Sequence, residues 1–205
     1  MKLAYLLTVI IACDFFRCNT SKNNVCSETA IKEFRLEENV KIIVHFSGKF
    51  SDSLTYSRIE IWIGENQVFK DTTSTEYLFD SKFYPQERKL KNGNYEVLMK
   101  VFNAPNYNKI QAFYFKDNQL DNKLLFPLFQ EKPIILDGKP EYFGVMNISE
   151  PPCYNCDSCF YNPTLYYEKN DLGIVLDTIQ TVKINTEKWG GFYGFKLSNK
   201  ILHCK

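Results

Sequence analysis

Side chains alternate between apolar and polar along most of the chain from Val40 onward, and this period of two restricts the chain to β-structure. In the segment 58–63 the three isoleucines occupy every second position, so they share one face of an expected strand. The following Gly64-Glu65-Asn66 is a turn sequence that leads into another short strand, as in a hairpin. Helical spacing is almost absent. The pattern therefore predicts an all-β protein.

Further strands are expected from composition and alternation in both halves of the chain. They lie at 40–46, 77–79, 110–115, 132–136, 142–148, 172–184 and 192–197. The dipeptides Asp137-Gly138 and Asn170-Asp171 are good hairpin turns. Only the segment 27–38 leaves helix and strand open, because its apolar residues fit both periods. The chain has 17 Phe, 13 Tyr and 2 Trp, which is enough apolar surface for a sizeable core.

The segment 90–101 starts with Leu90-Lys-Asn-Gly93-Asn-Tyr95 and continues with a strict alternation. This pattern resembles the tyrosine corner of immunoglobulin-like and fibronectin III-like β-sandwiches. The resemblance implies that Tyr95 stands near the start of strand F, where its hydroxyl bonds to upstream backbone and its ring seals the core. Residues 40–46 would then be strand B, the hairpin near 58–70 strands C and C′, and 110–115 strand G.

The predicted fold class is thus an all-β, antiparallel β-sandwich, with an immunoglobulin-like first half at 37–118 and additional β-hairpins packed on it from 119–205. A different sandwich topology or a jelly roll is the alternative. Leu98 and Phe102 are expected to point away from the face of Tyr95, so we expect the second half to cover them. No low-complexity linker divides the halves, which form either one domain or two tightly packed ones.

The amino terminus has the features of an export signal. Met1 and Lys2 precede the ten-residue apolar run Leu3–Ala12, which is too short to span a membrane as a helix. The run ends in Ile10-Ile11-Ala12-Cys13, which resembles the lipobox of bacterial lipoproteins. The resemblance implies that residues 1–12 are removed and that Cys13 receives a lipid. Residues 13–36 would then be a lipid-anchored segment on a membrane of the cell envelope. A plain secretory signal is the alternative.

Cysteine usage agrees with export. Of seven cysteines, assigning Cys13 to the lipid leaves an even number, and an oxidising compartment favours disulfides. The disulfide candidates are Cys18, Cys26, Cys153, Cys156, Cys159 and Cys204, whose pairing the spacing leaves open. The alternatives are a metal site formed by Cys153, Cys156 and Cys159 with His203, and a reactive Cys-x-x-Cys pair.

Charge and motifs exclude several classes of function. The 25 Lys and Arg residues nearly balance 24 Asp and Glu residues, so we expect no nucleic-acid partner. The chain has only two histidines and no nucleophile elbow, metalloprotease motif, phosphate-binding loop or dinucleotide fingerprint. We therefore expect no catalytic residues and no cofactor. The alternative is an envelope glycan hydrolase that uses a pair of carboxylates, since that chemistry needs only two acids at the right separation.

Two groups of aromatic residues are candidates for ligand binding. Trp189, Phe192 and Tyr193 lie among glycines, and Tyr161 and Tyr166 follow the cysteine-rich loop. Such rings can present a flat surface to a sugar or a protein, and the alternative is that they pack in the core or at a sheet edge. The sequence therefore predicts a lipid-anchored envelope protein that binds a glycan or protein ligand without catalysis.

Overall fold

The computed structural model describes residues 29–36, 39–47, 55–102, 108–130, 132–145 and 161–192, which form fourteen strands, one 3₁₀ turn and one α-helix. The elements are β1 Thr29–Arg35, β2 Val40–Ser47, β3 Thr55–Tyr56, β4 Arg58–Ile63, β5 Asn66–Lys70, β6 Tyr77–Leu78, β7 Gln86–Lys89, the 3₁₀ turn Lys91–Gly93, β8 Tyr95–Val101, β9 Lys109–Lys116, β10 Gln119–Pro127, β11 Ile134–Leu136, β12 Lys139–Val145, β13 Thr164–Asn170, β14 Gly173–Leu176 and α1 Thr178–Trp189. The predicted all-β class is confirmed.

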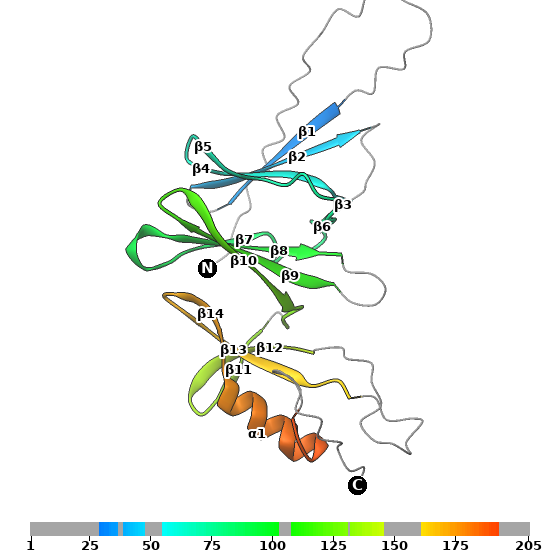
Figure 1. The fold of residues 1–205 in the computed structure, drawn as a ribbon, viewed down its shortest axis with the longest axis vertical. Coiled ribbons are helices and arrows are strands. Elements are labelled where there is room, and N and C mark those ends of the chain that lie inside the picture. The colour runs from blue at the N-terminus through cyan, green and yellow to red at the C-terminus, as the bar shows by residue number, and fades with distance from the viewer. Residues whose placement is uncertain are drawn as a thin grey trace, which may run out of the picture.

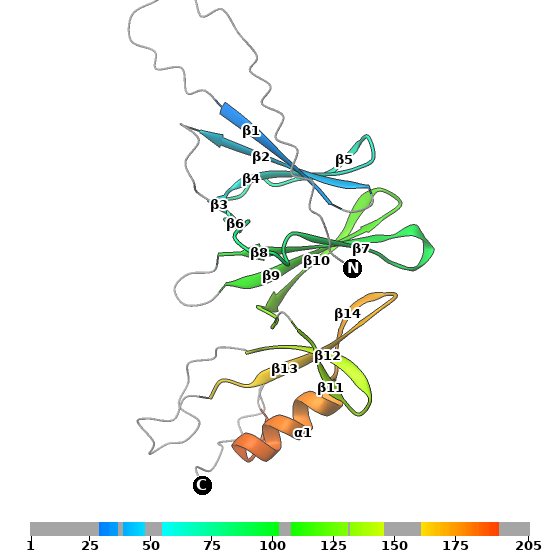
Figure 2. The same cartoon turned by 180° about the vertical axis from the view of Figure 1, so that it is seen from behind.

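The strands form three antiparallel sheets. The first has the order β1-β2-β4-β5, the middle one β10-β9-β8-β6-β3 with β7 also paired to β8, and the third β11-β12-β13-β14. Figure 1 shows the first sheet at the top, the middle sheet below it, and the third sheet and α1 at the bottom, and Figure 2 shows the same order from behind. The protein is therefore a β-sandwich extended by a further sheet and a helix.

The first core lies between the first and middle sheets. Alternate residues of β2 and β4 face it, including Val44, Ile59 and Ile61, which are all fully buried. The middle sheet contributes Phe113 and Phe115 from β9, whose rings stack 6.4 Å apart between centroids. This arrangement is what the period of two in the segment 58–63 predicted, because one face of each strand is apolar.

The second core lies between the middle and third sheets. Leu98 is 2% exposed and packs with Leu165, Tyr167 and Ile174 of the third sheet. The expectation that the second half of the chain covers Leu98 is therefore confirmed. It is wrong for Phe102, which lies one residue beyond the end of β8 and is 50% exposed.

The order of strands in the first sandwich differs from the immunoglobulin assignment made from the sequence. β2 pairs directly with β4, whereas strands B and C of an immunoglobulin domain lie in opposite sheets. The reason is that β1, β2, β4 and β5 are neighbours in that order in one antiparallel sheet, whereas β3, which lies between β2 and β4 in the sequence, pairs in the middle sheet. Tyr95 does start β8 after the turn that contains Gly93, and its half-buried ring packs on the first core. Its corner hydrogen bond stays a prediction.

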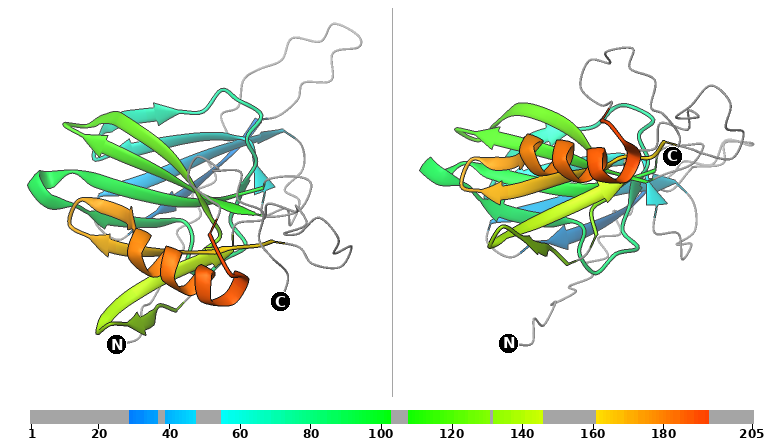
Figure 3. Two further views of the ribbon diagram at one scale, coloured as in Figure 1. Left: turned by 60° about the horizontal axis from the view of Figure 1, so that its bottom comes forward. Right: turned by 90° about the horizontal axis from the view of Figure 1, so that it is seen from below.

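Residues 172–184 were expected to form a strand, and most of them do not. Only β14 is extended; Asp177 then accepts a hydrogen bond from the Gln180 amide as the N-cap of α1, and Gly190 ends the helix at φ 76°. Figure 3 shows α1 lying across the third sheet on the side away from the other two sheets. No helix in the described part of the chain is long and apolar enough to cross a membrane.

Polar side chains attach α1 to the third sheet. Asn185 accepts a hydrogen bond from the Thr164 amide at 2.9 Å and donates one to the Thr164 carbonyl at 2.6 Å. The hydroxyl of Thr181 accepts a hydrogen bond from the Tyr166 amide at 3.0 Å. These hydrogen bonds satisfy backbone groups at the edge of β13, in the part of the strand that does not pair with β14. The side chains of α1 therefore take the place of a neighbouring strand there.

Candidate functional site

A pocket of about 600 Å³ lies beside the first sheet, on the face turned away from the first core. Its walls come from β2, from β4, from the end of β5 and from the loop that follows, and they comprise His45, Ser57, Arg58, Ile59, Glu60, Lys70, Asp71, Thr72, Thr73 and Ser74. The pattern of β4 explains this, because its isoleucines point into the core and Glu60 must point outward. We call this the Glu60 pocket.

Glu60 is the central carboxylate of the pocket and is 7% exposed. It accepts a hydrogen bond from the Trp62 indole nitrogen at 3.2 Å, and Lys70 Nζ lies 3.0 Å from its Oε1 atom. Burial alone would raise the pKa of Glu60, but the hydrogen bonds from Lys70 and Trp62 and the nearby charge of His45 hold that pKa below its usual value. Glu60 is therefore an ionised acceptor in a fixed position.

His45 lies beside Glu60 in the wall of the pocket. Its Nε2 atom is buried and lies 3.3 Å from Glu60 Oε1, so the two side chains form an ion pair when the imidazole is protonated. Because the imidazole lines the Glu60 pocket, it can also form a hydrogen bond to a hydroxyl group bound there.

Asp71 fixes the other wall of the pocket. It is 4% exposed and accepts hydrogen bonds from the Tyr77 hydroxyl and from the Thr73 amide, the latter at 2.7 Å. Burial acts to raise the pKa of Asp71, but the hydrogen bonds from Tyr77 and Thr73 outweigh it and lower that pKa. The hydroxyls of Thr73 and Thr75 are also bonded to each other at 2.8 Å, so the loop is held from several points.

The aromatic residues that the sequence suggested as a binding surface are mostly used in packing. Tyr161 and Tyr166 are 3% and 8% exposed, and Tyr161 packs edge-on against Trp189 with ring centroids 5.7 Å apart. Tyr166 stacks on Phe143, and Phe192 is half-buried against the second core. The packing interpretation therefore applies to Tyr161 and Tyr166, whose faces are not free for a ligand.

Several sequence-based candidates fall on residues that the structure does not describe. These are Cys13, Cys18, Cys26, Cys153, Cys156, Cys159, Tyr193, His203 and Cys204. The lipid anchor, the disulfides and the alternative cysteine metal site accordingly stay predictions. In contrast, none of the described residues around the Glu60 pocket was singled out from the sequence as a ligand contact. His45 lies within the strand expected at 40–46, and the structure confirms that strand as β2.

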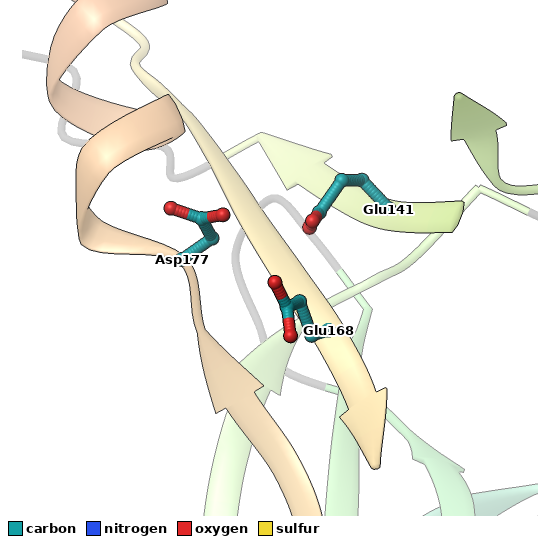
Figure 4. Close-up of side chains that lie close together, drawn as sticks. All are labelled: Glu141, Glu168 and Asp177. Atoms are coloured by element: carbon teal, nitrogen blue, oxygen red, sulfur yellow. The ribbon is translucent and has the colours of Figure 1, made fainter. Parts of the chain in front are cut away.

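One group of acids does come together in the third sheet. Carboxylate oxygens of Glu141, Glu168 and Asp177 all lie within 4.8 Å of one another (Figure 4). Glu141 is only 1% exposed, so its carboxylate cannot flank the scissile bond of a bulky glycan as a hydrolase requires. This group therefore does not favour the hydrolase alternative.

Comparison of the chain with protein-family models, with curated proteins and with solved structures finds no match.

Proposed function

We propose that this protein is a lipid-anchored component of the cell envelope that binds a glycan in the Glu60 pocket without catalysing a reaction. Two independent features support the proposal. The lipobox-like Ile10-Ile11-Ala12-Cys13 supports a location on a membrane outside the cytosol, and the described part of the chain contains a pocket lined mainly by residues with polar side chains. The expected partners are the membrane, through the lipid anchor, and a glycan.

The observation that carries the binding role is the pair of His45 and Glu60 in the wall of the pocket, where His45 Nε2 lies 3.3 Å from Glu60 Oε1. A sugar hydroxyl can both donate and accept, so it can form hydrogen bonds to both the imidazole and the carboxylate. The volume of about 600 Å³ lies within the usual range for a small-molecule site. A short glycan therefore fits the pocket in both chemistry and size.

The composition of the walls favours a glycan over a protein ligand. Glu60 and Asp71 are negatively charged acceptors of hydrogen bonds from hydroxyl groups. Arg58 and Lys70 are positively charged hydrogen-bond donors. A protein partner would be expected to place large apolar anchors in such a hollow, and Ile59 is the only aliphatic residue among those that line it.

The state of Glu60 also supports binding rather than catalysis. A general acid needs a pKa raised towards neutrality, whereas the hydrogen bonds from Lys70 and Trp62 lower the pKa of Glu60. The carboxylate is therefore suited to accepting hydrogen bonds from a ligand, not to giving up a proton to one.

The proposal is tested with the purified full chain on a glycan array, followed by titration calorimetry with the glycans that bind. Glu60→Gln removes the charge of the central acceptor, and Glu65→Gln is the matched control because Glu65 is exposed in the β4–β5 turn outside the pocket. We expect Glu60→Gln to weaken binding by about tenfold or more and Glu65→Gln to leave it unchanged. Equal affinity of the wild type and Glu60→Gln would contradict the proposed site.

The anchor needs a separate measurement. Intact-protein mass spectrometry of the membrane fraction is expected to show a chain that starts at Cys13 and carries acyl groups, and Cys13→Ser is expected to release the protein from that fraction. Recovery of an uncut chain from cytosolic extract would contradict the envelope location and leave the pocket result unaffected.

A further inference from the structure

Glu141, Glu168 and Asp177 come from two strands of the third sheet and the start of α1, and they point into one space (Figure 4). Glu141 belongs to β12 and Glu168 to β13, one position beyond the paired residues Tyr142 and Tyr167. Asp177 is the N-cap of α1. Like charges opposite each other in a sheet are destabilising, so this arrangement of three acids calls for a compensating charge.

Two of the three acids already have partners. Glu168 accepts a hydrogen bond from Lys139 Nζ at 2.8 Å, and Asp177 accepts one from the Gln180 amide at 2.9 Å. The position of Asp177 at the amino end of α1 adds the favourable field of the helix dipole. The charges of these two residues are therefore accounted for by the protein itself.

Glu141 is different, because it is 1% exposed and its Oε2 atom has no hydrogen-bond partner among the described residues. Burial of a carboxylate without a partner is costly, and its neighbours in Figure 4 are two further acids. The buried acid thus points into the cluster with an oxygen that no described residue satisfies.

From the convergence of these carboxylates and the unpartnered oxygen of Glu141, we infer that Glu141, Glu168 and Asp177 bind a calcium ion. Calcium takes oxygen ligands at 2.3–2.6 Å, so two oxygens on one ion lie no more than about 5 Å apart. The three carboxylates, with oxygens within 4.8 Å of one another, meet that condition. The side chain of Glu168 is 32% exposed, so water can reach the ion from that side and complete its coordination.

Lys139 is the competitor for this site. Its side chain is 65% exposed and pairs with Glu168, so it can turn into solvent when a divalent cation binds. An exposed ion pair of this kind contributes little to stability, which keeps the cost of releasing Lys139 small. The ion would join β12, β13 and the start of α1, and would thus fix the helix to the third sheet. This inference does not rest on the proposed glycan site, which lies on the first sheet.

The inference is tested by thermal unfolding of the full chain after treatment with a chelator, with calcium chloride added alone. We expect saturating calcium to raise the melting temperature by about 5 °C or more, because the ion binds only the folded state. Glu141→Gln and Glu168→Gln are expected to abolish this shift. Glu187→Gln, in the exposed face near the other end of α1, is the matched control and should keep it in full.

Calorimetric titration of calcium into the same four proteins separates binding from stability. Heat of binding in the wild type and Glu187→Gln, with none in the two cluster variants, supports the site. Absence of any calcium effect on the wild type would overturn it, as would a shift that survives in both Glu141→Gln and Glu168→Gln. A shift produced by magnesium but not by calcium would overturn the assignment of the ion.

Discussion

Arg88 and Glu96 stand directly opposite each other on β7 and β8 and form an ion pair within the middle sheet. Arg88 Nε donates to Glu96 Oε2 at 2.9 Å, and Glu96 is fully buried. The same guanidinium donates through Nη1 to the carbonyl of Asn170 at the end of β13, also at 2.9 Å. One arginine therefore connects two sheets that come from different halves of the sequence.

Removal of either partner alone is expected to be strongly destabilising. Glu96→Ala leaves the guanidinium of Arg88 without its carboxylate, and Arg88→Ala leaves a buried charge on Glu96. Each is expected to lower the free energy of unfolding by about 3–5 kcal/mol, measured by urea denaturation. The double variant Arg88→Ala with Glu96→Ala should cost clearly less than the two single changes added together. Strict additivity would show that the two residues do not act as a pair.

The burial of both faces of β8 gives a second prediction. Leu98→Ala removes a side chain that is 2% exposed between the middle and third sheets, and it is expected to cost about 2–5 kcal/mol of unfolding free energy. Leu125→Ala is the control, because Leu125 on β10 is 49% exposed, and it should change stability by no more than about 0.5 kcal/mol. Similar losses for both leucines would mean that the third sheet does not cover Leu98.

Asp71 makes stability depend on pH at the acid end. The pKa of its carboxyl is lowered in the folded chain, so its contribution is present above the ordinary value of 3.8 and is lost as the pH falls below that value. At pH 7 we expect Asp71→Asn to be less stable than the wild type by about 1.5–3 kcal/mol, since hydrogen bonds to a charged acceptor are replaced by neutral ones. The difference should shrink when urea denaturation is repeated at pH 3. A difference independent of pH would contradict this role.

Glu141 makes stability depend on pH in the opposite direction to Asp71. The pKa of this acid is raised to about 7 by burial and by the charges of Asp177 and Glu168, with Lys139 acting against them. The folded chain therefore holds a proton that the unfolded chain releases, and without metal the stability falls as the pH rises from about 4.5 towards 7. In chelator at pH 8, Glu141→Gln should unfold at a higher temperature than the wild type, and at pH 4 the two should be closer. A wild type that is more stable than Glu141→Gln at pH 8 in chelator would contradict the uncompensated charge.

Much of the fold follows from local sequence signals. The alternation in 58–63 and the turn sequence after it predicted the β4–β5 hairpin, and Asp137-Gly138 and Asn170-Asp171 mark the turns of two hairpins in the third sheet. These features are local, because a turn and a period of two are both encoded within a few residues. The stacking of three sheets is not encoded locally, because it depends on contacts between residues such as Leu98 and Leu165 that are distant in sequence.

The helix was missed because its apolar residues do not face the protein. Ile179 and Val182 are 76% and 45% exposed, whereas the buried positions of α1 are polar. Hydrophobic periodicity therefore did not predict the helix. The cap residues Asp177 and Gly190 were the usable signals, since both occur at the ends of the helix and have the residue types that helix ends prefer.

Neither candidate site could be recognised from spacing alone. Glu141 and Asp177 are brought together only when β12, β13 and α1 assemble, and His45 meets Glu60 across two strands that pair in the first sheet. A strand pattern does predict that Glu60 points away from the isoleucine face, but not which residues surround it. A site formed by a short motif can be recognised in a sequence. These two sites cannot, because the fold brings together residues that are distant in sequence.

The most direct test of the proposed binding role is the imidazole signal of His45 in a nuclear magnetic resonance titration with a glycan that binds on the array. The chain has two histidines, so a His45→Gln variant assigns both resonances. We predict that the Nε2 resonance of His45 shifts on saturation with the glycan while that of His203 stays unchanged. An unchanged His45 signal at saturation would contradict binding in the Glu60 pocket.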